Sequence, residues 1–307
     1  MSAALIALDW GTTSLRGWLV DRGGSVIDHV AAPRGILNVP GGDFAAAFQE
    51  ACGAWRRRAP ALPAIASGMI GSRQGWREAP YVQCPADFPA IAAGLVEVET
   101  GDGGRLAIVP GLTCENEGVP DVMRGEETQI AGALASEPST RLVILPGTHS
   151  KWAVIDGGRV SRFTSFMTGE VFAVLSRHSI LGRLMAGEAI DTAAFDRGAA
   201  AAARAGTSGA LLHRMFAART LGLFDRERPE ALRGYLSGLL VGSEVAEGLA
   251  LHASVAPALA PLIVGDPALA EYYRRALAGM GVAARIGPSD AALAGLLQIA
   301  CAAGRLR

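Results

Sequence analysis

The sequence predicts an α/β protein made of two related domains with a ligand cleft between them. Near the N-terminus, a strand, a Gly-Thr-rich turn, a second strand, a glycine turn and a third strand follow one another. The same order returns near the middle of the chain. Alternating strands and helices follow each copy, which is typical of α/β domains. The length of 307 residues suits two domains of ordinary size.

The two copies carry similar turn sequences. In the first, the apolar run Ala4–Leu8 leads into Asp9-Trp10-Gly11-Thr12-Thr13-Ser14. In the second, Leu142–Leu145 leads into Pro146-Gly147-Thr148-His149-Ser150. Such a turn can aim several backbone N–H groups and hydroxyls at one point, because glycine adopts dihedral angles closed to other residues. Two such turns facing each other would bind a polyphosphate from both sides, whereas a single one is equally typical of a structural hairpin.

The other elements of the first half follow from local patterns. Asp43–Arg57 has the apolar stripe of an amphipathic helix, and Arg56-Arg57-Arg58 suit its C-terminal end. Ala64–Ser67 and Leu106–Val109 are short apolar runs typical of buried strands. Apolar side chains recur on one face of a helix expected from about Pro120 to Ala135, and Glu127 lies on that same face.

The second half is mainly helical from Gly169 to Ala253. A strand at Leu262-Ile263-Val264-Gly265 is then expected to lead into a helix over Pro267–Leu277, followed by a strand at Val282–Ile286 and a final helix at Asp290–Ala303. We therefore place the two domains at residues 1–118 and 119–289, with the helix in 290–307 packing back on the first domain.

Charge and composition exclude several classes of partner. The net charge of −1 gives no electrostatic footprint for nucleic acid or an anionic membrane surface. The chain has no uncharged apolar run of about 18 residues, and its N-terminus lacks the features of a secretion signal. Four scattered cysteines without a C-x-x-C pair indicate the reduced thiols of a cytoplasmic protein rather than a zinc site.

Phosphoryl transfer requires a phosphate cradle, a divalent cation and a group that orients the accepting hydroxyl. The two Gly-Thr turns supply the cradle. Asp9 is the expected Mg²⁺ contact, through water, because Mg²⁺ loses its hydration shell reluctantly. The alternative for Asp9 is an acid that only stabilises a turn. Arg16 could reach the phosphates or form a salt bridge within the hairpin.

Asp121 is the candidate general base, since it stands at the expected helix start, upstream of the second turn. Acids near a helix N-terminus are also common as caps, so a structural role is the alternative. Glu126 and Glu127 are the other candidates for the base.

A glycine-rich loop reads Gly68-Met69-Ile70-Gly71-Ser72-Arg73-Gln74-Gly75-Trp76. The planar guanidinium of Arg73 matches a carboxylate, and Trp76 could pack on a carbon chain, or the segment could be a surface loop with one anchored aromatic. Gly265 opens a helix after an apolar strand, which suits the adenosine end of a nucleotide. The helix start near Gly169 could face the same ligand or carry a plain N-cap.

Five segments resemble the 2-dehydro-3-deoxygalactonokinase family, within the sugar kinase, Hsp70 and actin superfamily. They are Asp9–Trp18, Gly68–Tyr81, Pro120–Gly132 (PDVMRGEETQIAG), Pro146–Trp152 (PGTHSKW) and Asp290–Leu297. The resemblance implies two ribonuclease-H-like domains that use ATP and Mg²⁺ to phosphorylate 2-dehydro-3-deoxy-D-galactonate at O6, in galactonate catabolism. It also favours Asp121, because the catalytic aspartate of superfamily sugar kinases precedes the helix that leads to the second phosphate loop.

The two turns, the glycine-rich loop and the resemblance together give the candidate site residues. Those expected to bind the nucleotide are Asp9, Gly11, Thr12, Thr13, Ser14, Gly147, Thr148, His149, Ser150, Lys151 and Gly265. Those expected to bind the sugar acid are Gly71, Ser72, Arg73, Gly75, Trp76 and Arg124. The implied partners are ATP and a small sugar acid, and a homodimer stays open. The alternatives are a kinase of another small sugar, an ATP-binding module of the actin or Hsp70 kind, and a nucleotide or polyphosphate phosphohydrolase.

Overall fold

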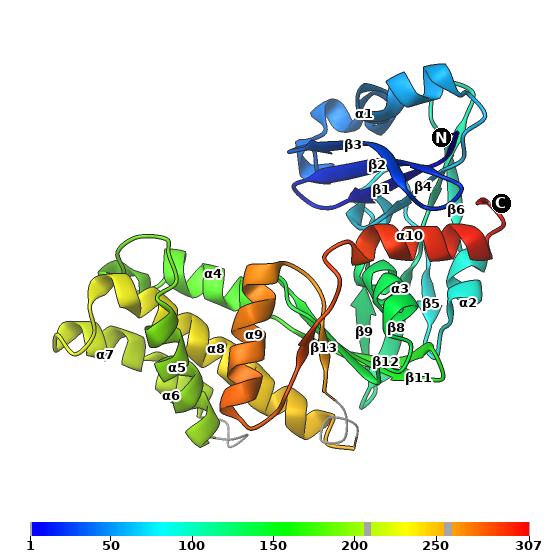
Figure 1. Cartoon of the computed structure of the whole chain (residues 1–307). Coiled ribbons are helices and arrows are strands. Elements are labelled where there is room, and N and C mark those ends of the chain that lie inside the picture. Colours follow the sequence, from blue (N-terminus) through cyan, green and yellow to red (C-terminus); the bar gives the residue numbers. More distant parts are fainter. Residues whose placement is uncertain (1, 206–209, 255–259, 307) are drawn as a thin grey trace. The chain divides into compact units, whose positions relative to one another are not determined.

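The computed structural model describes residues 2–205, 210–254 and 260–306 (Figure 1). Its contacts divide the chain into two units. The first comprises Met1–Ser139, Ile155–Phe163 and Asp290–Arg307, and the second comprises Thr140–Val154 and Thr164–Ser289. The boundary expected between residues 118 and 119 therefore differs from this division, which assigns residues 119–139 to the first unit.

The first unit is built on a six-stranded sheet in the order β3-β2-β1-β4-β7-β6. Its strands are β1 (Ala3–Trp10), β2 (Leu15–Asp21), β3 (Val26–Ala32), β4 (Ala64–Ser67), β6 (Val96–Glu99) and β7 (Arg105–Ile108). β1, β2 and β3 form an antiparallel meander, while β4 lies parallel to both β1 and β7. The three N-terminal strands and the strand at 64–67 are confirmed as predicted.

Helices cover both faces of this sheet (Figure 1). On one face, α1 (Phe44–Arg58) packs Phe44 and Phe48 against Ile6 and Leu8 in a single apolar cluster. Asp43 caps this helix, because its carboxylate accepts a hydrogen bond from the Ala46 N–H. The opposite face is covered by α10 (Ala291–Ala302), which runs beside α3 (Glu126–Ser136).

The close packing of α3 on α10 explains why residues 119–139 belong to the first unit. A Cβ built at Gly132 would lie 1.9 Å from the Ala291 carbonyl oxygen, and one built at Gly295 would lie 1.7 Å from the Thr128 carbonyl oxygen. Only glycine allows two helices to approach so closely. The connecting helix and the C-terminal helix are therefore one packed pair.

The prediction of a helix beginning near Pro120 is wrong. Val119–Met123 is strand β9, antiparallel to β8 (Gly111–Asn116), in a small sheet completed by β5 (Tyr81–Gln83). A turn with positive φ at Glu117 and Gly118 joins the two strands. Gly125, with φ of 106°, separates β9 from α3, so the helix begins only at Glu126. The sequence reading also omitted α2 (Phe88–Ala93).

The second unit repeats the strand order of the first. Its sheet runs β12-β11-β10-β13-β14, as β3-β2-β1-β4-β7 does in the first unit. The strands are β10 (Leu142–Leu145), β11 (Ser150–Asp156), β12 (Arg159–Phe166), β13 (Leu262–Ile263) and β14 (Arg285–Ile286). β11 is antiparallel to β10, whereas β13 is parallel to β10 and β14. This duplicated order confirms the predicted pair of related α/β domains.

Helices make up most of the rest of the second unit. They are α4 (Thr168–His178), α5 (Thr192–Ala205), α6 (Leu211–Met215), α7 (Ala217–Leu223), α8 (Pro229–Leu251) and α9 (Pro267–Gly279). α8 and α9 contribute Val241, Val245, Tyr273 and Leu277 to the core that also contains Ile144 of the sheet. Short helices and loops elsewhere extend this helical part.

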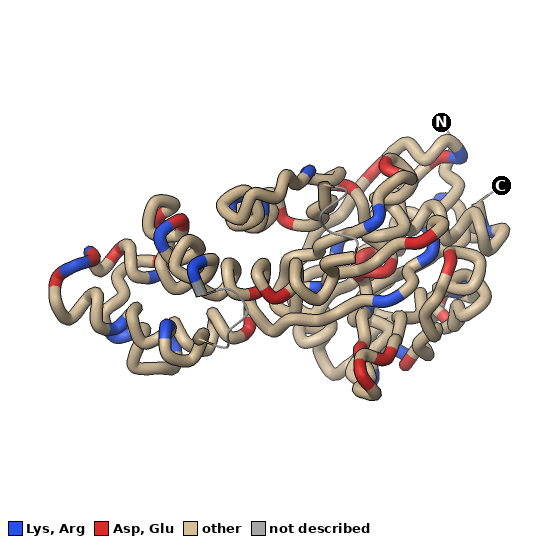
Figure 2. Tube along the Cα trace, turned by 90° about the horizontal axis from the view of Figure 1, so that it is seen from below, with Lys and Arg blue, Asp and Glu red and all other residues tan. Residues whose placement is uncertain are grey.

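Among the described residues, no helix combines the length and the apolar character needed to cross a membrane. Basic and acidic residues are both spread along the trace of each unit (Figure 2).

Candidate functional site

The first Gly-Thr turn, Gly11–Ser14, joins β1 to β2 and is held from behind by the short helix Ile36–Asn38. The Ile36 N–H donates to the Gly11 carbonyl at 3.0 Å, and the Leu37 N–H donates to the Thr12 carbonyl at 3.2 Å. Thr12, Thr13 and Ser14 are exposed. Within the described chain, their backbone N–H groups donate to no protein acceptor. These hydrogen bonds fix the turn on the side of the short helix. On its exposed side, the backbone N–H groups of the turn are available to an anion.

Asp9 lies at the carboxyl end of β1, beside this turn. Its Oδ2 is 2.5 Å from Nη2 of Arg16, the residue directly opposite on β2. Arg16 therefore forms the salt bridge within the hairpin that was one of its two expected roles. No group of three or more metal-ligating side chains occurs among the described residues, so Asp9 offers a single carboxylate.

Three segments meet at the carboxyl ends of the parallel strands β1 and β4. A Cβ built at Gly68, which follows β4, would lie 2.8 Å from the Trp10 carbonyl oxygen and 3.5 Å from Asp9 Oδ1. A Cβ built at Gly125, which precedes α3, would lie 3.3 Å from the Cα of Gly68. Ligands of α/β proteins bind at this kind of edge. The edge brings together Asp9, the glycine-rich loop and the start of α3.

Two carboxylates open α3 at this edge. Glu126 Oε2 accepts a hydrogen bond from the Arg124 N–H at 2.9 Å and is half-buried. Glu127 Oε2 accepts one from the Gly125 N–H at 2.6 Å, and its side chain is only 1 % exposed. Burial, and then the neighbouring charge of Glu126, raise the pKa of Glu127 to about 7. The buried carboxylate of Glu127 therefore holds its proton to a higher pH than an ordinary glutamate does.

Asp121 has a different environment from the one expected. It lies within β9 and not at a helix start, and its carboxylate accepts hydrogen bonds from the Val122 N–H at 2.8 Å and from Asn116 Nδ2 at 3.3 Å. The structural premise for a catalytic Asp121 is therefore wrong, while its role remains a prediction that a variant can test.

The glycine-rich loop presents its polar residues differently from the expectation. Arg73 is 85 % exposed and paired with Glu78 at 2.9 Å, which raises the pKa of Arg73. Trp76 packs among Trp10, Phe44 and Phe48, with ring centroids 6.3 Å apart in each pair. Trp76 is thus the anchored aromatic of the alternative interpretation, and it holds the loop on the core.

Arg124 lies against the same loop. Its Nη2 donates to the Ala79 carbonyl at 2.8 Å, its guanidinium lies 4.4 Å from the Tyr81 ring centroid, and Nη1 is 3.0 Å from a Cβ built at Gly71. Its Nε and Nη1, and the Ser72 hydroxyl, are buried without a hydrogen-bond partner among the described residues. Buried donors of this kind are costly unless an acceptor reaches them.

The second Gly-Thr turn, Gly147–Ser150, follows β10 in the second unit. Gly265 follows the neighbouring parallel strand, with φ of 146°, and a Cβ built there would lie 3.5 Å from the Pro146 carbonyl oxygen. Asp266 caps α9 by accepting a hydrogen bond from the Leu269 N–H. The proposed adenosine segment and the second turn therefore share one edge of the second sheet.

The start of α4 packs directly on this second turn. A Cβ built at Gly169 would lie 2.4 Å from the Gly147 carbonyl oxygen, and the Glu170 N–H donates to the Thr148 carbonyl at 3.0 Å. Glu170 Oε2 is also 2.5 Å from Nε2 of the exposed His149. Lys151 follows the turn on β11, where it is buried and donates to the Ser165 hydroxyl at 2.5 Å.

One residue of this edge was missed by the sequence reading. Glu244 of α8 is 3 % exposed, and its carboxylate accepts hydrogen bonds from Ser150 Oγ, Trp152 Nε1 and Tyr273 Oη. Burial raises the pKa of Glu244, although these donors oppose the effect. An acid in an apolar helix is the only local signal that could have pointed to it.

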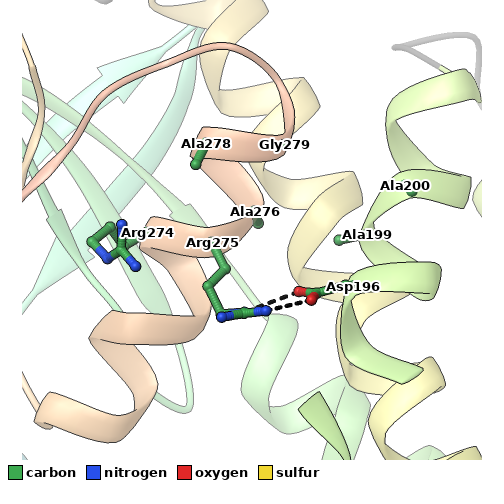
Figure 3. A pocket seen from close by; sticks show the side chains of 8 residues that line it. All are labelled: Asp196, Ala199, Ala200, Arg274, Arg275, Ala276, Ala278 and Gly279. Carbon is green, nitrogen blue, oxygen red and sulfur yellow. Dashed lines mark hydrogen bonds and ion pairs between the residues drawn. The ribbon is translucent and has the colours of Figure 1, made fainter. Parts of the chain in front are cut away.

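A separate pocket of about 320 Å³ lies between α5 and the C-terminal half of α9 (Figure 3). Arg275 and Asp196 line this pocket and form an ion pair through two hydrogen bonds. Its lining contains neither Gly265 nor any residue of the two turns. We therefore do not assign it to the site.

The family model described as 2-keto-3-deoxy-galactonokinase matches residues 9–299. The chain belongs to this family. The predicted resemblance to the 2-keto-3-deoxy-galactonokinase family is thereby confirmed, and the match includes both Gly-Thr turns, the glycine-rich loop, α3 and Glu244.

Other members of the 2-keto-3-deoxy-galactonokinase family are similar over almost their whole length. The 2-dehydro-3-deoxygalactonokinase of Escherichia coli (strain K12) is 36 % identical over 304 residues, covering 98 % of each chain. A probable 2-dehydro-3-deoxygalactonokinase of Rhizobium meliloti (strain 1021) is 36 % identical over 294 residues, covering 94 % of this chain and 93 % of the relative.

One solved structure supports the same assignment, and a second shares only the fold. The crystal structure of a Sinorhizobium meliloti protein described as a 2-dehydro-3-deoxygalactonokinase is 35 % identical, with a TM-score of 0.87, and the match covers 96 % of this chain and 98 % of that one. An ADPNP-bound activator of 2-hydroxyisocaproyl-CoA dehydratase from Clostridium difficile, at 13 % identity and a TM-score of 0.51, shares the fold alone over 97 % of this chain and 93 % of its own.

Proposed function

We propose that this chain transfers the γ-phosphoryl group of ATP to O6 of 2-dehydro-3-deoxy-D-galactonate, giving the 6-phosphate and ADP in galactonate catabolism. The observation that carries this proposal is family membership over residues 9–299, together with a Gly-Thr turn at the same place in each unit. Exposed backbone donors in a turn after a strand are suited to phosphate binding. The partners are then ATP and one small sugar acid. The buried free cysteines Cys52, Cys84 and Cys114 support a cytoplasmic location.

Both turns contribute to binding the ATP phosphates in this proposal. Thr12, Thr13 and Ser14 of the first turn, and Gly147, Thr148 and His149 of the second, supply backbone N–H groups, and Gly265 lies toward the adenosine. Asp9 fits a Mg²⁺ ion that arrives with the nucleotide, because Mg²⁺ uses one or two carboxylates and keeps several waters. When bound, the ion neutralises charge on the phosphate oxygens.

We propose Glu126 as the general base. The base is expected at the start of the connecting helix, and that helix begins with Glu126 rather than with Asp121. Its half-exposed carboxylate would accept the proton of the O6 hydroxyl while O6 bonds to the γ-phosphorus. The bond from that phosphorus to the ADP oxygen breaks, and ADP leaves with the bonding electrons. The neighbouring Glu127 is buried, and its carboxylate accepts a hydrogen bond from the Gly125 N–H, so Glu126 is the acid of the pair that a substrate hydroxyl could reach.

We propose Arg124 as the group that binds the substrate carboxylate. The expected residue, Arg73, already has Glu78 as a partner and is largely surrounded by solvent. Arg124 has two guanidinium nitrogens without a protein acceptor, beside Gly71 and the equally unpaired Ser72 hydroxyl. Hydrogen bonds from a guanidinium N–H to a carboxylate are charge-assisted and stronger than those between neutral groups. Binding would therefore satisfy donors that are otherwise buried and unpaired.

A coupled assay of ADP formation tests this function. We expect turnover with 2-dehydro-3-deoxy-D-galactonate and not with the related aldonic acid that lacks the keto group, and mass spectrometry should find one phosphate on O6. Steady ATP loss without any acceptor would instead indicate a phosphohydrolase. Light scattering on the same sample would test for the homodimer.

A further inference from the structure

The buried carboxylate of Glu244 lies at the centre of the nucleotide-binding half of the second unit. Its Oε1 accepts hydrogen bonds from Ser150 Oγ at 2.7 Å and Trp152 Nε1 at 2.8 Å, and its Oε2 accepts one from Tyr273 Oη at 2.6 Å. Three donors, two on β11 and one on α9, therefore converge on one carboxylate of α8.

These donors belong to the segments that form the nucleotide edge. Ser150 is the last residue of the second turn, and Trp152 follows it on β11. Tyr273 lies on α9, the helix that starts after Gly265. The Glu244 carboxylate therefore links the second turn and β11 to α9.

The face of α8 that carries Glu244 packs closely against Trp152 of β11. Glu244, Gly248 and His252 are spaced four residues apart, so they line one side of the helix. A Cβ at Gly248 would lie 2.7 Å from the Trp152 ring, and His252 stacks on that ring with an interplanar angle of 8°. Trp152 thus lies flat along α8, with its indole N–H directed at Glu244.

We infer that Glu244 is a positioning residue for nucleotide binding, which holds the second Gly-Thr turn in a fixed position against α9. The inference rests on the proposed function, because it assigns the second turn to the phosphates of ATP. A buried carboxylate is costly, and replacing such a group with an apolar one often stabilises a protein. A network with all its donors satisfied gives a defined geometry instead. Glu244 acts through Ser150 and Trp152, without touching the nucleotide.

Calorimetric titration of ADP into the full chain tests this inference, because ADP binding requires neither the sugar acid nor turnover. Glu244→Met removes the acceptor and keeps the length of the side chain. We expect roughly 10-fold weaker ADP binding, since at least one charge-assisted hydrogen bond to the turn is lost. The KM for the sugar acid should change less than about 3-fold. Glu244→Gln keeps an oxygen for Ser150 and Trp152, so it should recover part of the affinity.

Two further variants keep the test decisive. Ser150→Ala removes only the hydroxyl of the turn, and we expect weaker ADP binding in a protein with wild-type circular dichroism. Asp196→Asn breaks the ion pair with Arg275 at the separate pocket of the same unit (Figure 3) and should leave ADP affinity unchanged. Wild-type ADP affinity in folded Glu244→Met, or in Ser150→Ala should Glu244→Met not fold, would overturn the inference. A wild-type protein that binds ADP but does not phosphorylate the sugar acid would reject the proposed function and leave this test intact.

Discussion

Asp9 and Arg16 occupy directly opposed positions of β1 and β2, and Arg16 Nη2 lies 2.5 Å from Asp9 Oδ2. The two side chains are 20 % and 49 % exposed, so solvent screens the pair and its contribution to stability is small. Its relevance is to the ligand. Asp9, which lies beside the first turn, already has a cationic partner, and a metal ion that arrives with ATP must share its carboxylate with Arg16.

Asp9→Asn should therefore raise the Mg²⁺ concentration needed for half-maximal rate by about 10-fold or more, because the amide loses the negative charge that holds the hydrated ion. Excess Mg²⁺ should restore part of the rate. Arg16→Gln is the matched control: it frees the carboxylate and should leave the Mg²⁺ requirement the same or lower. Initial rates over a Mg²⁺ series at saturating ATP and sugar acid measure both. An unchanged Mg²⁺ requirement in Asp9→Asn would remove Asp9 from the metal site.

Glu126→Gln should lower kcat by about 10²–10⁴-fold, the range typical of a positioned general base. The amide keeps an oxygen for the Arg124 N–H, so the start of α3 should remain folded. Asp121→Asn is the comparison, and it should retain kcat within a few-fold, because that side chain lies within β9. ADP titrations should give wild-type affinity for both proteins. The reverse order of the two kcat values would return the assignment to Asp121.

Arg124→Lys should raise the KM for the sugar acid by about 10-fold or more, with little change in the KM for ATP. Lysine keeps the charge but lacks the planar guanidinium. Arg73→Ala should change neither KM by more than about 2-fold, since Arg73 is exposed and paired with Glu78. Steady-state kinetics with each substrate varied in turn separate the two arginines. Equal increases in both KM values for Arg124→Lys would indicate that it only holds the loop at Ala79 and Tyr81.

Local sequence patterns were sufficient to predict the elements that end at a glycine or a proline. β4 and β10 are short apolar runs that end at a glycine or proline, and both were predicted with their observed bounds. The segment of β9 was predicted as the start of a helix because proline is common at the first position of a helix, and Pro120 fits that position. In the structure it lies on a strand at the edge of its sheet, where a missing N–H is tolerated.

The site was less predictable, because it depends on contacts between distant residues. Glu244 is 94 residues from Ser150 and 92 from Trp152, so no local spacing could connect them. The choice between Arg73 and Arg124 likewise depends on which guanidinium already pairs with an acidic side chain. The sequence contains two arginines suited to a carboxylate. Only the structure shows that Arg73 pairs with Glu78, whereas two guanidinium nitrogens of Arg124 have no hydrogen-bond partner among the described residues.

Glu127→Gln should change how stability depends on pH. Burial and the Glu126 charge raise the pKa of Glu127 from 4.5 to about 7 in the folded protein. Below about pH 4.5 this carboxyl is protonated in both the folded and the unfolded state, and its contribution to stability is fully present. Between pH 4.5 and 7 the unfolded chain releases the proton while the folded chain keeps it, so stability falls as the pH rises, by roughly 3 kcal/mol in all.

The glutamine variant resembles the neutral acid at every pH and does not have this dependence. The melting temperature of Glu127→Gln, compared with that of the wild type, should therefore increase steadily between pH 5 and pH 7.5 and then level off. The buried Glu244 contributes a similar dependence to both proteins, and the comparison cancels it. Thermal unfolding followed by circular dichroism at five or six pH values measures the difference. A constant difference across this range would mean that Glu127 ionises normally in the folded state and that burial does not raise its pKa.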